Sequence, residues 1–184
     1  MPAASPDAGF SAPNFFSVIG APFAGVTLYA LVLRVIELLS LPNDLMEAYN
    51  GEMEQLFDGS LVLVLVTALI VAPLVEEIVF RGALLRALQK GMNTPMAVLI
   101  SSVLFAAVHT GAIQMTYAFI LGLILCIVRL NSRSLWGSVL MHISFNAANF
   151  LPVYDVFFCR VPLAIAVFVC AFLLACVRNK KAGS

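Results

Sequence analysis

The chain has 184 residues, of which 62% are hydrophobic and only 11% are charged, and its formal net charge is zero. Soluble domains are about 45–50% apolar and about 25% charged, so this composition excludes an ordinary soluble domain and indicates a protein that lies in a lipid bilayer. The balanced charge gives no support for a nucleic-acid partner. At this length we expect a single integral-membrane domain over residues 1–184.

Six apolar segments are candidates for membrane spans, because a spanning helix needs about 20 mostly apolar residues. They lie near residues 17–41, 60–88, 95–112, 113–130, 134–151 and 161–178. Only Thr110, Gly111 and Ala112 separate the third from the fourth, so a tight turn must fall there. The predicted fold class is therefore all-α: a polytopic transmembrane helix bundle with about six spanning helices.

The segment 43–59 differs from these six because it carries five acidic residues and no basic residue. Its apolar residues recur at helical spacing, and they are Leu45, Tyr49, Met53, Leu56 and Phe57. We expect a short amphipathic helix at the membrane interface. It could cap the bundle, act as a lid, or simply connect two spans.

Basic residues follow the second, fourth and sixth predicted helices. They are Arg86 and Lys90, then Arg129 and Arg133, then Arg178, Lys180 and Lys181. The intervening connections 43–59 and 110–112 contain no Lys or Arg, and the connection 152–160 contains only Arg160. By the positive-inside rule, this alternation predicts that both termini are cytoplasmic.

Two adjacent glutamates, Glu76 and Glu77, fall inside the second apolar segment, with Arg81 one turn later. A charged side chain in lipid costs at least about 2.5 kcal/mol on insertion scales, so both carboxylates are expected to face the protein interior or a wet cavity. Glu77 and Arg81 share a helix face, whereas Glu76 points about 100° away. One glutamate can therefore line a cavity while the other pairs with Arg81. Pro73 precedes the pair and is expected to bend the helix.

The only two histidines, His109 and His142, also lie in apolar segments. With a helical rise of about 1.5 Å per residue, Glu76, His109 and His142 reach related depths on three helices, and we expect them to converge. Asn146 shares a face with His142. A carboxylate can act as a general base or acid, and imidazoles can polarise water, stabilise an oxyanion or bind a metal. These groups suffice for water-mediated hydrolysis of an amide.

Each of these residues also has a structural interpretation. The Glu77–Arg81 pair can serve packing alone, a buried histidine can be a packing residue, and His142 with Asn146 can join helices by hydrogen bonds. The constellation also suits a proton-coupled transporter with a relay of ionisable groups, or a non-catalytic membrane scaffold or immunity protein. A transporter is expected to show discontinuous helices or repeated halves, and the sequence shows no repeat.

Three motifs occur in order along the chain: Glu76-Glu77-x-x-Phe80-Arg81-Gly82, Phe105-x-x-x-His109 and His142-x-x-x-Asn146. Together they resemble the CAAX protease and bacteriocin-processing family of intramembrane proteases, also called the CPBP or ABI family. The resemblance covers roughly residues 60–150, which would form the motif-bearing catalytic core. It implies an intramembrane endopeptidase that hydrolyses peptide bonds.

The resemblance also implies a role for each motif residue. Glu76 and His109 would activate a water molecule, and His142 with Asn146 would hold the developing oxyanion. The second glutamate and the arginine one turn later would support the site. The implied partners are the lipid bilayer and a peptide or protein substrate, either prenylated or a bacteriocin-like precursor. The chain's small size favours a prokaryotic-style member in the plasma membrane.

The sequence leaves the metal content of such a site open. Members of this family are often labelled metalloproteases, and Glu76 with two histidines could bind zinc with one open position. However, no HExxH motif is present, and the candidate ligands come from separate helices. A water activated by glutamate without a metal fits the residues equally well, so no cofactor is certain and zinc is the alternative.

Overall fold

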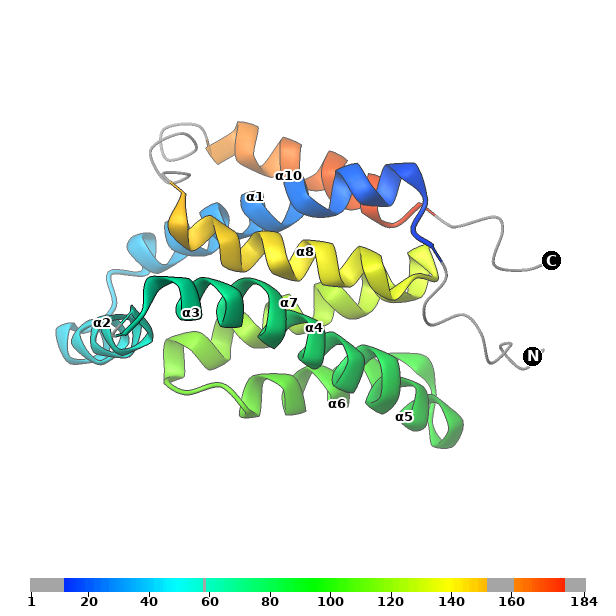
Figure 1. Cartoon of the computed structure of the whole chain (residues 1–184), viewed down its shortest axis with the longest axis horizontal. Coiled ribbons are helices and arrows are strands. Elements are labelled where there is room, and N and C mark those ends of the chain that lie inside the picture. Colours follow the sequence, from blue (N-terminus) through cyan, green and yellow to red (C-terminus); the bar gives the residue numbers. More distant parts are fainter. Residues whose placement is uncertain (1–11, 58, 152–160, 178–184) are drawn as a thin grey trace.

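The computed structural model describes residues 12–57, 59–151 and 161–177. All regular structure in these ranges is helical, which confirms the predicted all-α class (Figure 1). Part of the predicted charge pattern lies outside the described residues, namely Arg160 and the basic tail of Arg178, Lys180 and Lys181.

The helices follow the predicted segments in order. The first is α1 (Phe15–Leu39), which leads into the amphipathic helix α2 (Asn43–Phe57). One long helix then covers Leu61–Gly91 and consists of α3 (Leu61–Val66), η1 (Thr67–Val71), α4 (Ala72–Glu76), η2 (Glu77–Leu84) and α5 (Leu85–Gly91). The bundle continues with α6 (Thr94–Ala107), α7 (Ala112–Ser132), α8 (Leu135–Ala147), the 3-10 turn η3 (Ala148–Phe150) and α10 (Val161–Ala175).

Three helices are long and apolar enough to cross a membrane, among the residues that the structure describes. They are α1, the composite helix Leu61–Gly91 and α7. Helices α6 and α10 are apolar but shorter, and α8 has 13 residues. Each of the six predicted apolar segments therefore forms a helix, and three of these six helices are long enough to cross a membrane.

Helix α6 ends at Ala107, whereas the sequence analysis extended it to residue 112. The backbone N–H of His109 donates to the carbonyl of Ala106 at 3.0 Å, which closes a tight turn. Gly111 then adopts a φ of +77°, a conformation that favours glycine. His109 therefore lies in the turn between α6 and α7, and its predicted position inside the helix was wrong.

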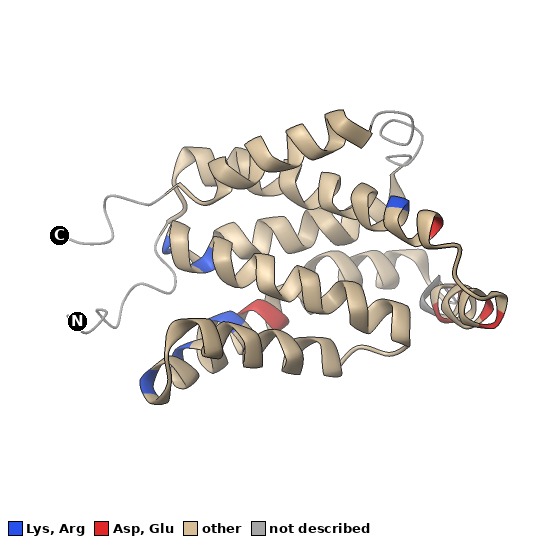
Figure 2. Ribbon diagram, turned by 180° about the vertical axis from the view of Figure 1, so that it is seen from behind, with Lys and Arg blue, Asp and Glu red and all other residues tan. Residues whose placement is uncertain are grey.

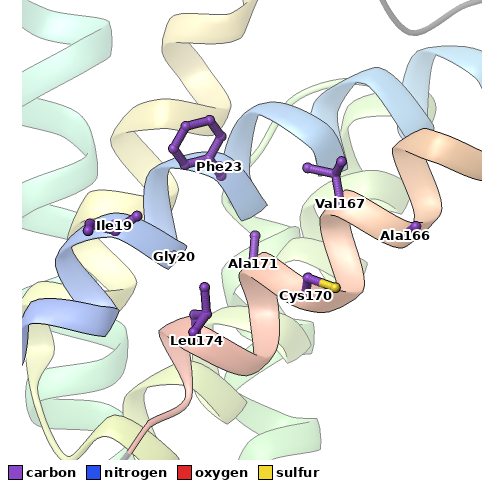
Figure 3. A pocket seen from close by; sticks show the side chains of 8 residues that line it. All are labelled: Ile19, Gly20, Phe23, Ala166, Val167, Cys170, Ala171 and Leu174. Atoms are coloured by element: carbon purple, nitrogen blue, oxygen red, sulfur yellow. The ribbon is translucent and has the colours of Figure 1, made fainter.

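Helix α1 packs closely on α10 through small residues, as helices in lipid do when no hydrophobic force drives them together. Figure 3 shows Gly20 of α1 beside Ala171 and Leu174 of α10, at a shallow apolar groove of about 310 Å³. A Cβ atom at Gly20 would lie 2.5 Å from the carbonyl oxygen of Ala171. The hydroxyl of Ser17 also donates to the carbonyl of Ala175 at 2.8 Å, which fixes the register of the two helices.

Gly20→Ala is expected to lower the free energy of unfolding by about 1–3 kcal/mol, because the added methyl overpacks the α1–α10 contact. The matched control is Gly51→Ala in α2, where no atom lies within 4 Å of the added Cβ. Thermal unfolding of both variants in detergent measures the difference. Equal unfolding temperatures for the two variants would contradict the close packing described here.

Apart from the Arg34–Glu37 pair of α1, charged residues separate along the bundle (Figure 2). Basic residues of α5, of the last turn of α7 and of the α7–α8 connection gather at one end, and they are Arg86, Lys90, Arg129 and Arg133. The acidic helix α2 lies at the opposite end. Between these ends, the glutamate pair and Arg81 place charge within the bundle. For the described connections, basic residues therefore lie at one end, as the sequence pattern predicts.

Candidate active site

The helix that carries the two glutamates changes its hydrogen-bond register around Pro73. Two π-helical segments, η1 and η2, flank the short helix α4. Pro73 has no N–H, and the N–H of Ala72 bonds to the carbonyl of Thr67, five residues earlier. In a regular α-helix the carbonyl of Ala68 would accept from the N–H of Ala72, and in a π-helix from the N–H of residue 73. Neither bond forms here, and the side-chain amide of Asn146 donates to this carbonyl at 3.0 Å. Interruptions of this kind recur at functional sites.

Glu77 is the fully buried member of the glutamate pair. Its Oε1 lies 2.8 Å from Nη1 of Arg81 and accepts a hydrogen bond from Nδ1 of His142 at 3.1 Å. Arg81 is itself 1% exposed, and its Nη2 donates to the carbonyl of Gly122 in α7 at 3.4 Å. The guanidinium carbon lies 4.1 Å from the centroid of the Phe105 ring. The predicted pairing of Glu77 with Arg81 is confirmed, and it neutralises two buried charges.

Glu76 points away from Arg81, and its side chain is 27% exposed. Its Oε2 lies 3.7 Å from Nε2 of His142. The imidazole of His142 therefore lies between the two carboxylates, with Nδ1 towards Glu77 and Nε2 towards Glu76. Because an ionised carboxylate only accepts hydrogen bonds, Nδ1 carries a proton. Glu77 thus fixes the orientation of the ring that faces Glu76, as the carboxylate of a catalytic triad fixes its histidine.

His109 is held by the end of α6. Its Nδ1 lies 2.8 Å from the carbonyl oxygen of Phe105, one of the last carbonyls of that helix, which have no helical partner. Since a carbonyl oxygen only accepts, Nδ1 is the donor, and Nε2 of the neutral ring keeps its lone pair. The side chain is half-buried, so this nitrogen lies in a position that water can reach.

The ring of Phe105 lies at the centre of the site. It is fully buried, and its centroid lies 4.8 Å from that of His109 and 5.7 Å from that of His142. Phe80 packs edge-on against it at 5.2 Å. Sequence reasoning treated Phe105 only as a motif position, whereas in the structure its ring packs against the guanidinium of Arg81 and against both imidazoles.

The structure brings four of the predicted site residues into direct contact, namely Glu76, Glu77, Arg81 and His142. His109 joins them through Phe105, and Asn146 lies one turn beyond His142. An amide nitrogen carries two hydrogens, so Asn146 can hold Ala68 and donate a second hydrogen bond.

Sequence reasoning missed Ser138, a fully buried serine of α8 that lies close to the carboxylate of Glu77 and whose hydroxyl donates to the carbonyl of Leu135 at 3.0 Å. Its spacing of four residues from His142 was the available signal.

The residues do not assemble a three-ligand metal site. Among the described residues, no three His, Cys, Asp or Glu side chains form a group that could hold a metal ion. Nδ1 of His109 is bonded to a carbonyl and Nδ1 of His142 to Glu77, so each ring offers only Nε2. One nitrogen per ring is enough for a metal ligand, but a catalytic zinc takes three protein ligands around one open position, and the described residues do not group Glu76, His109 and His142 closely enough for that.

A buried Glu77–Arg81 pair with a second, partly exposed glutamate and two histidines, held inside an apolar helix bundle, is typical of a functional site in a membrane protein. Residues 58–148 match the family model described as "Type II CAAX prenyl endopeptidase Rce1-like". This segment contains all six predicted site residues, and its match to a family of CAAX endopeptidases confirms the family prediction. The family and the apolar helices together identify an integral membrane protein.

Comparison with curated proteins and with solved structures gives no match.

Proposed function

We propose that the chain is an intramembrane endopeptidase that hydrolyses a peptide bond with a water activated by Glu76 and His109. The observation that carries the proposal is the placement of His142 between the two glutamates, 3.1 Å from Glu77 and 3.7 Å from Glu76. With His142 protonated on both nitrogens, two carboxylates balance an imidazolium and the guanidinium of Arg81. Such a neutral set is compatible with burial in a membrane protein.

In the proposed reaction, Glu76 removes a proton from a water that Nε2 of His109 orients. The resulting hydroxide attacks the carbonyl carbon of the peptide bond. Nε2–H of His142 and the second amide hydrogen of Asn146 donate to the oxyanion that forms. The C–N bond then breaks, and Glu76 returns its proton to the leaving amine, so that one water is consumed and one acid and one amine are released.

A peptide or protein that carries an apolar group is the substrate class that we favour. The family description names prenyl endopeptidases, and prenylated peptides are therefore the first substrates to test, with unmodified bacteriocin-like precursors second. An apolar cavity of about 330 Å³ between α1, α2 and α7 supports this choice. Its lining includes Val32, Leu45 and Ile113.

We also propose that the basic end of the bundle faces the cytoplasm. The separation of basic and acidic ends in Figure 2 supports this orientation, because cytoplasmic connections carry the excess of Lys and Arg. Both termini would then be cytoplasmic, and α2 would lie at the opposite interface.

Cleavage of a quenched peptide panel by the purified chain in detergent tests the function, with each peptide offered in farnesylated and unmodified form. We expect cleavage by the wild type and loss of it in His109→Ala. His142→Ala is expected to lower turnover while the variant stays folded, as judged by thermal unfolding.

Cleavage that survives both Glu76→Ala and His109→Ala would contradict the proposed mechanism. Loss of cleavage with a chelator, restored by zinc, would instead establish the metal alternative. A proton-coupled transporter predicts proton flux into liposomes and no cleavage of any peptide.

A further inference from the structure

The amphipathic helix α2 lies against the turn that carries His109. In Figure 1, α2 crosses the end of the bundle at which α7 begins, and the two helices are in contact. The carboxylate of Glu52 lies directly against Gly111, so that a Cβ atom at Gly111 would overlap both carboxylate oxygens. Gly111 is the last residue of the turn and lies two positions after His109.

The position of this carboxylate suits the beginning of α7. The first N–H groups of a helix lack helical partners and carry partial positive charge, which favours a nearby anion. Gly111 is the N-cap of α7 and has no side chain that could accept from them, and the first turn of α7 has no acidic residue. Glu52 therefore supplies from α2 the negative charge that the sequence of α7 itself lacks.

A second contact holds α2 in the same place. The phenols of Tyr49 in α2 and Tyr117 in α7 lie close to each other. Burial raises the pKa of Tyr49, so this phenol stays protonated and uncharged beside Tyr117. Tyr117 in turn packs against Phe145 of α8, with ring centroids 6.0 Å apart. The contact of Tyr49 with Tyr117 holds α2 against α7, and it therefore also fixes the position of Glu52, which lies on the same helix.

We propose that Glu52 is a positioning residue for His109. Its carboxylate holds the N-terminus of α7 and so fixes the turn Val108–Gly111, which sets the direction of the His109 ring. This inference rests on the proposed function, in which Nε2 of His109 orients the attacking water. Because the reacting groups must be aligned to within about 1 Å for full activity, release of the turn lowers turnover without removing any group that touches the substrate.

The chain has only two histidines, which makes the test specific. A sample labelled with carbon-13 and nitrogen-15 in histidine gives one set of ring signals each for His109 and His142, assigned with His109→Ala and His142→Ala. In Glu52→Ala we expect the His109 signals to shift and those of His142 to stay in place. The control is Glu54→Ala, an exposed carboxylate on the same helix, which should move neither set.

Glu52→Gln removes only the charge, and it provides the same test if Glu52→Ala does not fold. Unmoved His109 signals in the folded variant, or equal shifts of both histidines, would overturn the proposal. These signals can be read whether or not the chain cleaves peptides, so failure of the positioning role is distinguishable from failure of the proposed function.

Kinetics give a second readout. In Glu52→Ala, kcat is expected to fall about 10-fold with KM unchanged, within the roughly 100-fold range that a misplaced catalytic group can cause. Glu54→Ala should retain the wild-type kcat. A rise in KM with unchanged kcat in Glu52→Ala would indicate a substrate contact and would overturn the positioning role.

Discussion

Glu76→Gln is expected to lower kcat/KM for peptide cleavage by about 10²–10⁴-fold, the usual contribution of a general base. The amide keeps the size of the side chain but cannot take a proton from water. Because Glu76 is partly exposed and is not the partner of Arg81, the variant should unfold at nearly the wild-type temperature. Steady-state kinetics on the best peptide of the panel, together with thermal unfolding, measure both effects.

The matched control is Glu54→Gln, which neutralises an exposed carboxylate on α2, away from the site. It is expected to retain full activity. If Glu76→Gln kept more than about one tenth of the wild-type activity, Glu76 could not be the general base. Equal loss of activity in the two variants would point to a general effect of net charge instead.

Arg81→Met is expected to lower the free energy of unfolding by about 3–5 kcal/mol, because it leaves the carboxylate of Glu77 buried without its counter-ion. The double variant Glu77→Leu/Arg81→Met should recover most of this loss, since apolar side chains often replace a buried ion pair without cost. It should nevertheless remain inactive, because Nδ1 of His142 has lost its acceptor. Chemical denaturation and cleavage assays on the same samples separate the two effects.

The partly exposed pair of Arg34 and Glu37 provides the control. Their side chains lie 2.5 Å apart and are 26% and 42% exposed, and an exposed pair contributes about 1 kcal/mol or less. Arg34→Met should therefore cost far less than Arg81→Met. Comparable losses in the two variants would mean that burial does not strengthen the Glu77–Arg81 pair, and an active double variant would show that Glu77 does not orient His142.

The sequence predicts those features of the site that depend on spacing within one helix. The contact of Glu77 with Arg81 follows from their separation of four residues, and the different environment of Glu76 follows from the helical rotation between neighbours. The six helical segments follow from the length of apolar runs. All of these features depend on the geometry of a single helix, so they can be predicted from one sequence.

Features that depend on contacts between helices could not be predicted in the same way. Pro73 indicated an interruption, but only the packing of α8 shows that Asn146 donates to the Ala68 carbonyl. This contact gives Asn146 a structural role beside its proposed role at the oxyanion. The early end of α6 likewise depends on the His109 side chain, which bonds to the carbonyl of Phe105.

The sequence pattern also does not predict the contact between α2 and the turn that carries His109. The periodicity of residues 43–59 predicts an amphipathic helix, and the structure confirms it as α2. Nothing in that periodicity distinguishes Glu52 from the exposed Glu54. The distinction arises because Gly111, about 60 residues later, leaves room for one carboxylate at the beginning of α7.

The account predicts that the isolated chain hydrolyses a peptide bond through Glu76, and mass spectrometry of the products formed in water enriched in heavy oxygen tests this most directly. The wild type should release a peptide with one heavy oxygen in its new carboxyl group, and folded Glu76→Gln should release almost none over the same time. Equal product from both proteins, or no cleavage of any peptide by the folded wild type, would contradict the account.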